Sequence, residues 1–240
     1  MSISKNEQRL VRSLSQKKYR DATGLFVVEG EKMVAEALKS GLDVVSVYRR
    51  EEIGEETMAR LSQLSSPSPV LAVLRRRTGL LPDPDKGLFL ALDGIRDPGN
   101  LGTILRIADW FGIDGVYASE DTVDLYNPKV VQSTMGAIFR VPFQMTDIPS
   151  FCRRVRSGGG LVYGTFLDGE NLYGKALDTG LNAPSVIVIG NESNGISPET
   201  AACVSDRLFI PPYPVEDPGS ESLNAAVATA ITVAEFRRRS

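Results

Sequence analysis

Two segments of this sequence place polar side chains and glycines directly after apolar runs, and a third places polar side chains after a proline-rich stretch. The segment "DPGNLGTILRIADWFG" contains Asn100 and Arg106, and "VIVIGNESNGIS" contains Glu192. The segment "ESLNAAVATAI" contains Ser222 and Asn224. Amide, guanidinium, carboxylate and hydroxyl groups can all hold a polar ligand, and glycines let the backbone approach that ligand closely. These segments are therefore the first places to look for a site.

Arg106 is the member of this set that is hardest to explain by structure alone. Apolar residues flank it in "TILRIADWF", so its guanidinium needs a carboxylate, phosphate or carbonyl partner. Helical side chains lean toward the N-terminus, and Arg106 can therefore reach back toward Asn100, although the spacing is just short of two turns. Asn100 and Ser222 have a simpler interpretation as helix N-caps. Gly190 and Gly195 also suit an ordinary strand-to-helix turn.

The residue composition removes several classes of protein. There is no histidine, and Cys152 and Cys203 lie in different segments without the spacing of metal ligands, which excludes zinc chemistry and Ser-His-Asp catalysis. We expect both cysteines to be small core residues. Neither a GxGxxG fingerprint nor a Walker lysine is present, so dinucleotide and P-loop sites are not supported. No apolar run reaches the roughly 20 residues of a membrane helix, and we expect a cytoplasmic protein.

Positive charge is concentrated at the start of a chain whose net charge is −3. Residues 1–80 carry 14 Lys and Arg against 10 Asp and Glu, whereas residues 81–240 carry 13 against 20. In the opening stretch the only acidic side chain is Glu7, and the basic residues are Lys5, Arg9, Arg12, Lys17, Lys18 and Arg20. Such a local basic footprint is typical of phosphate binding, and a solvated helix face is the alternative.

Apolar periodicity predicts two α/β domains that would position these residues. Residues 1–78 alternate helix and strand and are predicted to form a small α/β/α domain. Composition then shifts to charged residues, proline and glycine in "RRRTGLLPDPDKG", which indicates a linker over 79–87. Over 88–240 strands alternate with helices, and this predicts a parallel sheet with helices on both faces. In this second domain the predicted strands are 87–95, 115–119, 139–145, 161–166, 185–193 and 206–211, and the last helix begins at Ser222.

The three polar segments, in this order and on one α/β domain, resemble the three motifs of the SpoU/TrmH family of RNA ribose 2′-O-methyltransferases, in the SPOUT superfamily. The segment "GLFVVEGEKMVAEAL" also resembles the small RNA-binding domain that many members carry. The resemblance implies a C-terminal trefoil knot that forms a pocket for S-adenosylmethionine. It places catalytic residues at Asn100, Arg106, Glu192, Ser222 and Asn224, and backbone contacts to the cofactor at Thr165, Gly190, Ile210 and Leu223.

The same resemblance implies a homodimeric enzyme that methylates structured RNA without a metal. A separate N-terminal domain favours ribosomal over transfer RNA as the substrate, by analogy at the level of the fold. A catalytically silent RNA-binding or assembly module that keeps the knotted fold is the alternative. A guanidinium stays protonated near neutral pH, so we expect Arg106 to polarise the 2′-hydroxyl or to hold its phosphate rather than to act as a base.

Three expectations concern the C-terminal segment. The loop between Pro211 and Ser222 is longer and richer in proline than the compact loop of the family, which bears on the shape of the cofactor pocket. We expect Ser222 and Asn224 to project into one pocket with Asn100, Arg106 and Glu192. The residues predicted to pack the last helix are Leu223, Ala226, Val227, Ala230 and Ile231.

Overall fold

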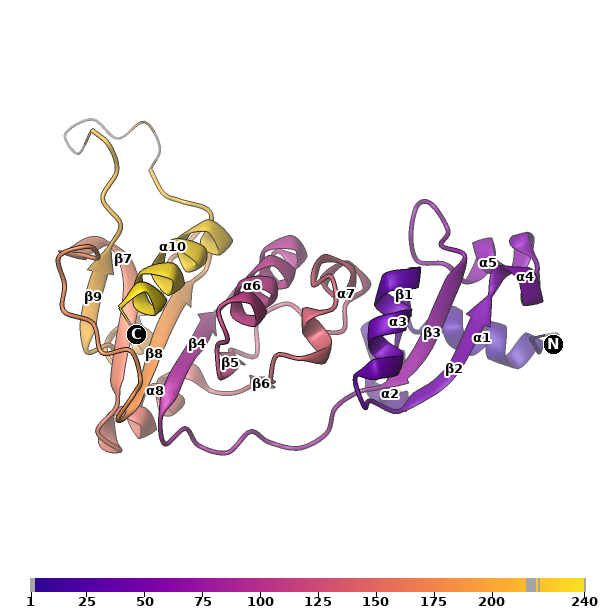
Figure 1. The fold of residues 1–240 in the computed structure, drawn as a ribbon, viewed down its shortest axis with the longest axis horizontal. Helices are drawn as coiled ribbons and strands as arrows, with labels where there is room; N and C mark the ends of the chain where they lie inside the picture. The colour runs from indigo at the N-terminus through magenta and orange to yellow at the C-terminus, as the bar shows by residue number, and fades with distance from the viewer. Residues whose placement is uncertain (1–2, 215–218, 220, 240) are drawn as a thin grey trace. The chain divides into compact units, whose positions relative to one another are not determined.

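The protein is represented by a computed structural model, which describes residues 3–214, 219 and 221–239 (Figure 1). The chain divides into two compact units. The first unit consists of Met1–Gly79 together with Asp124–Arg140, and the second of Leu80–Val123 together with Val141–Ser240. In the described ranges, no helix is both long and apolar enough to cross a lipid bilayer.

The first unit is built around a three-stranded antiparallel sheet in the order β1-β3-β2. Successive side chains of a strand point to opposite faces, so Phe26 and Val28 pack with α3 and α7, whereas Leu25 and Val27 pack with α1 and α5. The sheet is therefore covered by helices on both faces. The elements are α1 (Lys5–Ser13), α2 (Lys17–Thr23), β1 (Leu25–Glu29), α3 (Glu31–Lys39), β2 (Val44–Arg49), α4 (Arg50–Ile53), α5 (Glu55–Leu61), β3 (Val70–Arg75), α7 (Pro128–Ser133) and the 3₁₀ helix η1 (Ala137–Phe139).

The segment 124–140 lies in the first unit, although the sequence prediction placed it in the middle of a contiguous second domain. Its residues Val131, Ile138 and Phe139 belong to the same buried cluster as Phe26. The turn η1 also shortens the strand that was predicted from 139, because the following strand begins only at Phe143. The periodicity of a segment shows that one face must be buried, but it does not show which sheet buries it.

The second unit contains a six-stranded sheet in the order β6-β5-β4-β8-β7-β9, and every neighbouring pair is parallel. This confirms the predicted α/β class with a parallel sheet. The elements are β4 (Gly87–Asp93), α6 (Pro98–Trp110), β5 (Gly115–Ala118), β6 (Phe143–Met145), α8 (Ile148–Ser157), β7 (Leu161–Asn171), β8 (Pro184–Gly190), α9 (Pro198–Ala201), β9 (Asp206–Phe209) and α10 (Ala225–Arg238).

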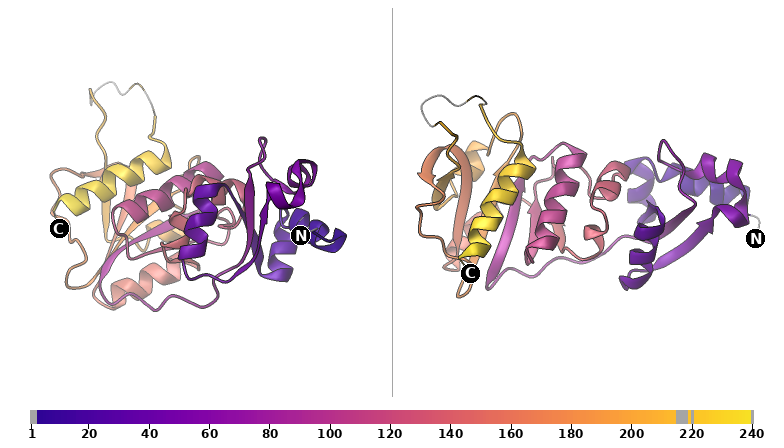
Figure 2. Two further views of the ribbon diagram at one scale, coloured as in Figure 1. Left: turned by 45° about the vertical axis from the view of Figure 1, so that its right-hand side comes forward. Right: turned by 45° about the horizontal axis from the view of Figure 1, so that its top comes forward.

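Helices cover both faces of this parallel sheet. Phe89 and Ala91 of β4 pack in one cluster with Phe151 and Cys152 of α8, and Cys203 after α9 belongs to the same cluster. The alternate residues of β4 are fully buried on the opposite side, where α6 and α10 lie side by side (Figures 1 and 2). Both cysteines are free and buried, and burial raises the pKa of the Cys152 thiol to about 12. A thiol in that state is a core residue and not a nucleophile.

The C-terminal arginines fix α10 to its surroundings in the second unit. Arg237 donates from Nε to the carbonyl of Phe111 at 2.8 Å, just past the end of α6. Arg239 donates to the carbonyl of Tyr173 at 2.7 Å, and it also donates from Nε to Glu235 at 2.7 Å. The Glu235 carboxylate also accepts two hydrogen bonds from Arg238. The guanidinium of Arg238, and then that of Arg239, hold the pKa of Glu235 at about 2, against an ordinary value of 4.5.

Replacing Glu235 with glutamine is expected to lower the free energy of unfolding by about 1–3 kcal/mol at pH 7, because charge-assisted hydrogen bonds are lost. A lowered folded-state pKa gives stability that is fully present above the unfolded pKa and is lost as pH falls toward the folded value. The difference between wild type and Glu235→Gln should therefore shrink between about pH 4.5 and 2. Urea unfolding over this pH range measures it, with the exposed Glu120→Gln as the control. A difference that stays constant with pH would contradict the assignment.

Candidate active site

The structure brings one polar residue from each of the three sequence segments into a single hydrogen-bonded chain. Asn224 donates from Nδ2 to Oδ1 of Asn100 at 2.9 Å. Asn100 in turn donates from its own Nδ2 to Oε1 of Glu192 at 2.7 Å. The three side chains are separated by 92 and 124 residues in sequence, so only the fold places them together.

The topology of the parallel sheet explains this meeting. Asn100 lies in the first turn of α6, which follows β4, and Glu192 follows β8, which pairs directly with β4. The register aligns Asp93 with Gly190, so both strands end at the same edge of the sheet. Asn224 immediately precedes α10, which packs against α6. The carboxyl edge of a parallel sheet is where α/β proteins place their ligand sites.

The helix caps differ from those that the sequence suggested. Asp97 caps α6, because its side chain accepts from the backbone N–H of Asn100 at 2.8 Å, and Asn100 itself is not the cap. Asn224 caps α10 by accepting from the N–H groups of Ala226 and Val227, so the predicted start at Ser222 is wrong. The amide of Asn224 therefore has two tasks, since its oxygen caps the helix while its nitrogen binds Asn100.

Arg106 does not join this chain of hydrogen bonds. Its side chain is exposed, and it has no side-chain partner among the residues that the structure describes. Its neighbours Ile104 and Leu105 are fully buried and face the sheet, away from it, so the predicted carboxylate, phosphate or carbonyl partner stays a prediction. Arg106 shares the outer face of α6 with Trp110, which is 85% exposed.

Several other predicted residues of the third segment are also exposed. The hydroxyl of Ser222 has no hydrogen bond within the described part of the chain. Leu223 and Val227 are 48% and 47% exposed, so the prediction that they pack the last helix is wrong. Leu223 precedes the helix, and Val227 lies on its outer face. Ala226 is buried as expected, and Ala230 and Ile231 are half-buried.

The four residues expected to hold a cofactor lie along the same edge of the sheet or just before α10. Thr165 aligns with Leu208 of β9, close to Ile210, and its hydroxyl donates to the carbonyl of Val188 in β8 at 3.2 Å. A Cβ on Gly190 would lie 2.3 Å from the backbone of the returning turn, so only glycine fits there. In the described ranges, no hydrogen bond engages the backbone of Ile210 or Leu223. Of the loop 211–221, positions 215–218 and 220 lie outside the described residues.

The predicted RNA-binding residues separate into an exposed group and one buried residue. Lys5, Arg9 and Arg12 are exposed on α1 at helical spacing. On α2, Lys17 pairs with Asp21, and Lys18 lies over the ring of Tyr19, which is 40% exposed, at 4.8 Å. Arg20 is only 2% exposed and forms an ion pair with Asp124 at 2.6 Å, so it is a structural residue and its predicted contact with RNA is wrong.

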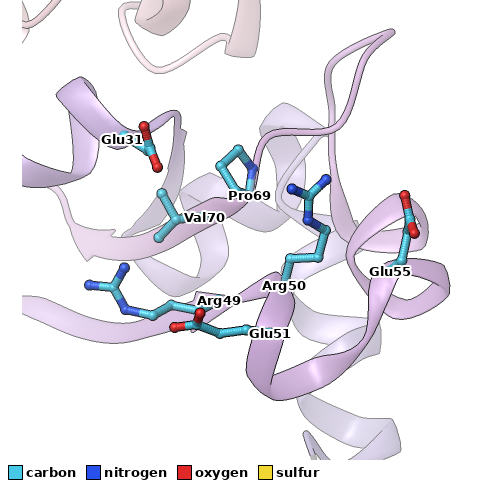
Figure 3. A pocket seen from close by; sticks show the side chains of 7 residues that line it. All are labelled: Glu31, Arg49, Arg50, Glu51, Glu55, Pro69 and Val70. Carbon is cyan, nitrogen blue, oxygen red and sulfur yellow. The ribbon is translucent and has the colours of Figure 1, made fainter.

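A hollow of about 360 Å³ lies in the first unit and was not anticipated from the sequence (Figure 3). Arg49 and Arg50 reach into it from the end of β2 and the start of α4, and Pro69 and Val70 form an apolar side. The sequence signal for this hollow was the run "RREE", which is also typical of a solvated surface. No residue of the three motifs lines this hollow. Among the described residues, no group of three or more acidic or thiol side chains could hold a metal ion.

Comparisons with known proteins agree with this geometry. A sequence model of the "SpoU rRNA Methylase family" matches residues 87–234, and one of the "MRM3-like substrate binding domain" matches residues 6–75. The chain is 31% identical to the 23S rRNA (guanosine(2553)-2'-O)-methyltransferase RlmP of Bacillus subtilis, over 94% of each chain.

Solved structures extend the similarity to the whole chain. A TrmH-family protein from Porphyromonas gingivalis has 39% identity and a TM-score of 0.87, covering 99% of both chains. An AdoMet-bound rRNA methyltransferase from Sinorhizobium meliloti has 29% identity and a TM-score of 0.88, covering 100% of this chain and 98% of the other. The family model spans more than half of the sequence and contains all three residues of the hydrogen-bonded chain. The protein therefore belongs to the SpoU rRNA methylase family.

Proposed function

We propose that this protein transfers a methyl group from S-adenosylmethionine to the 2′-hydroxyl of a ribose in ribosomal RNA. The observation that carries the proposal is the hydrogen-bonded chain from Asn224 through Asn100 to Glu192, which unites the three family motifs at one edge of the sheet. The Bacillus subtilis relative is named as a 23S rRNA 2'-O-methyltransferase, and the Sinorhizobium meliloti relative binds AdoMet.

The residues at the sheet edge fit the cofactor. S-adenosylmethionine supplies an electrophilic methyl group on a sulfonium. The backbone groups of Ile210 and Leu223 have no partner within the described ranges and are suited to hold its polar edges. The half-exposed side chain of Leu223 offers an apolar contact for a planar base. Thr165 and Gly190 complete the proposed pocket, and a trefoil knot over the C-terminal segment would bring these loops together.

The chemical step needs the ribose hydroxyl aligned with the methyl group and relieved of its proton. The 2′-oxygen forms a bond to the methyl carbon while the carbon–sulfur bond breaks, and the hydroxyl proton leaves. Asn100 engages one oxygen of Glu192, and the other has no partner among the described residues, so it is available to accept this hydroxyl proton. We assign Arg106 to the hydroxyl or its phosphate, and Ser222 and Asn224 to substrate contacts. Positioning of this kind is worth many orders of magnitude in rate.

RNA recognition is assigned to the first unit. Lys5, Arg9 and Arg12 present three exposed positive charges on one face of α1, and Lys17 and Lys18 extend this basic surface onto α2. The match of residues 6–75 to a substrate-binding domain supports this role. We therefore retain 1–78 as the substrate domain and 79–87 as a linker, and we assign the knotted methyltransferase domain to 88–240 without the segment 124–140. Residues 124–140 add a packing segment to the first of these.

A homodimer is the proposed assembly, and the cytoplasm, which holds the ribosomal RNA substrate, is the proposed compartment. Trp110 and Val227 are exposed on the outer faces of α6 and α10, two helices that pack against each other. Exposed large apolar side chains on the outer faces of two packed helices are consistent with a protein interface. Arg106 lies on the same face of α6 as Trp110, so a second copy docked there would meet the guanidinium that lacks a partner in the described part of one chain.

Transfer of labelled methyl groups tests the proposed activity directly. The purified chain and labelled S-adenosylmethionine are incubated with ribosomal RNA from a strain that lacks this protein. We expect label at one ribose position, and no label when that position carries a 2′-deoxyribose. Calorimetry with S-adenosylmethionine separates the alternatives. Cofactor binding without transfer would point to another substrate, whereas neither binding nor transfer would favour the silent RNA-binding module.

A further inference from the structure

The turn that carries Glu192 is held by the end of β4 at both of its ends. At the first end, Asn191 donates from Nδ2 to the carbonyl oxygen of Gly94 at 2.6 Å. At the other end, the backbone N–H and the hydroxyl of Ser197 each donate to Oδ2 of Asp93 at 2.8 Å. Glu192 therefore sits in a short segment whose two ends are attached to Asp93, the last residue of β4, and to Gly94, which follows it.

Asn191 also shapes the turn from inside. Its Oδ1 accepts from the backbone N–H of Ser193 at 2.9 Å and from that of Asn194 at 3.1 Å. Its own backbone exchanges two hydrogen bonds of 2.9 Å with Gly195. One amide side chain thus satisfies two backbone donors within the turn and one acceptor across the sheet edge, which uses nearly its full bonding capacity.

The anchor point at Gly94 is itself fixed. Gly94 is buried and has a φ of +75°, and its N–H donates to the Ser119 hydroxyl at 2.8 Å. A Cβ at this position would lie 3.1 Å from Oδ2 of Asp121 and 3.6 Å from Cβ of Asn191, so the glycine lets the Asn191 side chain come close. The carbonyl that receives Asn191 is therefore held in one orientation.

These bonds form a closed path around the candidate site. The Asn191 side chain joins the turn to Gly94, the chain runs from Gly94 to Asn100 in α6, and Asn100 returns to Glu192 at 2.7 Å. The bonds from Asn191 to Gly94 and from Asn100 to Glu192 therefore tie the two loops next to the Glu192 carboxylate, and the two bonds from Ser197 to Asp93 tie them farther along the turn. If the bond at Asn191 is removed, the turn stays tied to Asp93 through Ser197, but the side of the turn that carries Glu192 keeps only the Asn100 contact among the side-chain bonds of the described residues.

We propose that Asn191 is a positioning residue of the methyl-transfer site, which acts by fixing the Glu192 carboxylate against Asn100. The proposal rests on the proposed function for its kinetic readout. The proposal gives Asn191 no contact with the substrate. Its contribution passes through Glu192, and displacement of a catalytic group by about 1 Å can lower a rate by about 100-fold.

Asn191→Asp is the sharpest variant, because it keeps the shape and the Oδ1 acceptor but replaces the Nδ2 donor with an oxygen that faces the Gly94 carbonyl. We expect kcat for methyl transfer to fall by about 10- to 100-fold, with KM for RNA and Kd for S-adenosylmethionine within about threefold of wild type. Asn194→Asp is the matched control. Asn194 is exposed in the same turn, and its side chain has no hydrogen bond within the described ranges, so wild-type kinetics are expected.

A double-mutant cycle with Glu192→Ala distinguishes positioning from a general loss of stability. If Asn191 acts through Glu192, Asn191→Asp should cost little additional rate once the carboxylate is absent. If Asn191→Asp lowered kcat by the same factor in the wild-type and Glu192→Ala proteins, the proposal would be overturned. A kcat for Asn191→Asp within twofold of wild type would overturn it as well.

Amide hydrogen exchange gives a readout that does not depend on activity. The N–H groups of Ser193 and Asn194 bond to Asn191, and Asn191→Ala should raise their exchange rates at least tenfold while strands β4 and β8 stay protected. Unchanged exchange in this turn would overturn the positioning role. If the wild-type protein transferred no methyl group but Asn191→Ala loosened the turn, the proposed reaction would fail while the structural basis of the inference would stand.

Discussion

Replacing Arg106 with alanine is expected to lower kcat for methyl transfer by about 10²–10³-fold, the usual effect of removing one charged donor from a reaction centre. The melting temperature should stay close to that of wild type. Arg106 is exposed and has no side-chain partner among the described residues, and substitutions of this kind change the free energy of unfolding by less than about 0.5 kcal/mol. A large kinetic effect without a stability effect is the signature of a residue kept for function.

Arg106→Lys separates charge from geometry. Lysine keeps the positive charge but loses the planar fork of donors, so we expect it to recover less than tenfold over alanine. Arg154→Ala is the matched control. Arg154 is half-exposed, bonds to Asp83 and lies on α8, which packs on the opposite face of the sheet from α6. Near-normal turnover by Arg106→Lys with RNA bound would contradict the role assigned to the guanidinium fork. Loss of dimerisation in Arg106→Ala would indicate that Arg106 acts in dimer assembly instead.

The sequence predicted the second unit well because its signals are local. A continuous apolar run such as that of β8 predicts a strand buried on both faces, and helices between such strands require parallel pairing. The first unit also has the predicted alternation of helices and strands. The segment 124–140 was assigned to the wrong neighbours, since burial of Val131 and Phe139 against Phe26 depends on contacts over about a hundred residues.

The meeting of Asn100, Glu192 and Asn224 was accessible from sequence, because strand ends of a parallel sheet share one edge. The caps were harder, since Asp97 and Asn100 are both good capping residues. Proline at 98 was the missed signal, because proline favours the first position of a helix and makes the preceding residue the cap. Asn191 left no such signal. Its side chain reaches across to Gly94, and sequence spacing does not reveal a bond between two different loops.

The prediction from charge patterning that Arg20 contacts RNA was wrong for a related reason. A run of basic residues predicts an anion-binding surface only if the side chains reach solvent, and α2 turns Arg20 inward. Its guanidinium bonds to the Asp124 carboxylate and to the carbonyls of Leu14 and Ser15, the latter two at 2.8 Å. The five remaining basic residues of the group are exposed. Mutation of Arg20 should therefore affect stability, and mutation of its exposed neighbours should affect RNA binding.

Arg20→Met is expected to destabilise the first unit by about 3–5 kcal/mol, because the Asp124 carboxylate would keep its partial burial and lose its cation. Methionine retains most of the packing volume, so the loss reports the ion pair and the two carbonyl bonds rather than a cavity. Urea unfolding followed by hydrogen exchange in β1 and β3 measures it. The matched variant is Arg12→Met on the exposed face of α1, which should change stability by less than about 0.5 kcal/mol.

For RNA binding we expect the larger effect from Arg12→Met and the smaller one from Arg20→Met. Arg12→Met removes one exposed charge and should weaken RNA binding. It should also reduce the slope of the logarithm of the binding constant against the logarithm of salt concentration by about one. Arg20→Met, measured at a temperature where it remains folded, should bind RNA as wild type does. If Arg20→Met is fully stable but binds RNA weakly, the ion pair with Asp124 is dispensable and Arg20 belongs to the RNA surface after all. If Arg20→Met is unstable but binds RNA normally, the segment 124–140 is confirmed as part of the first unit's packing. The substitution removes the ion pair that holds Asp124 in place.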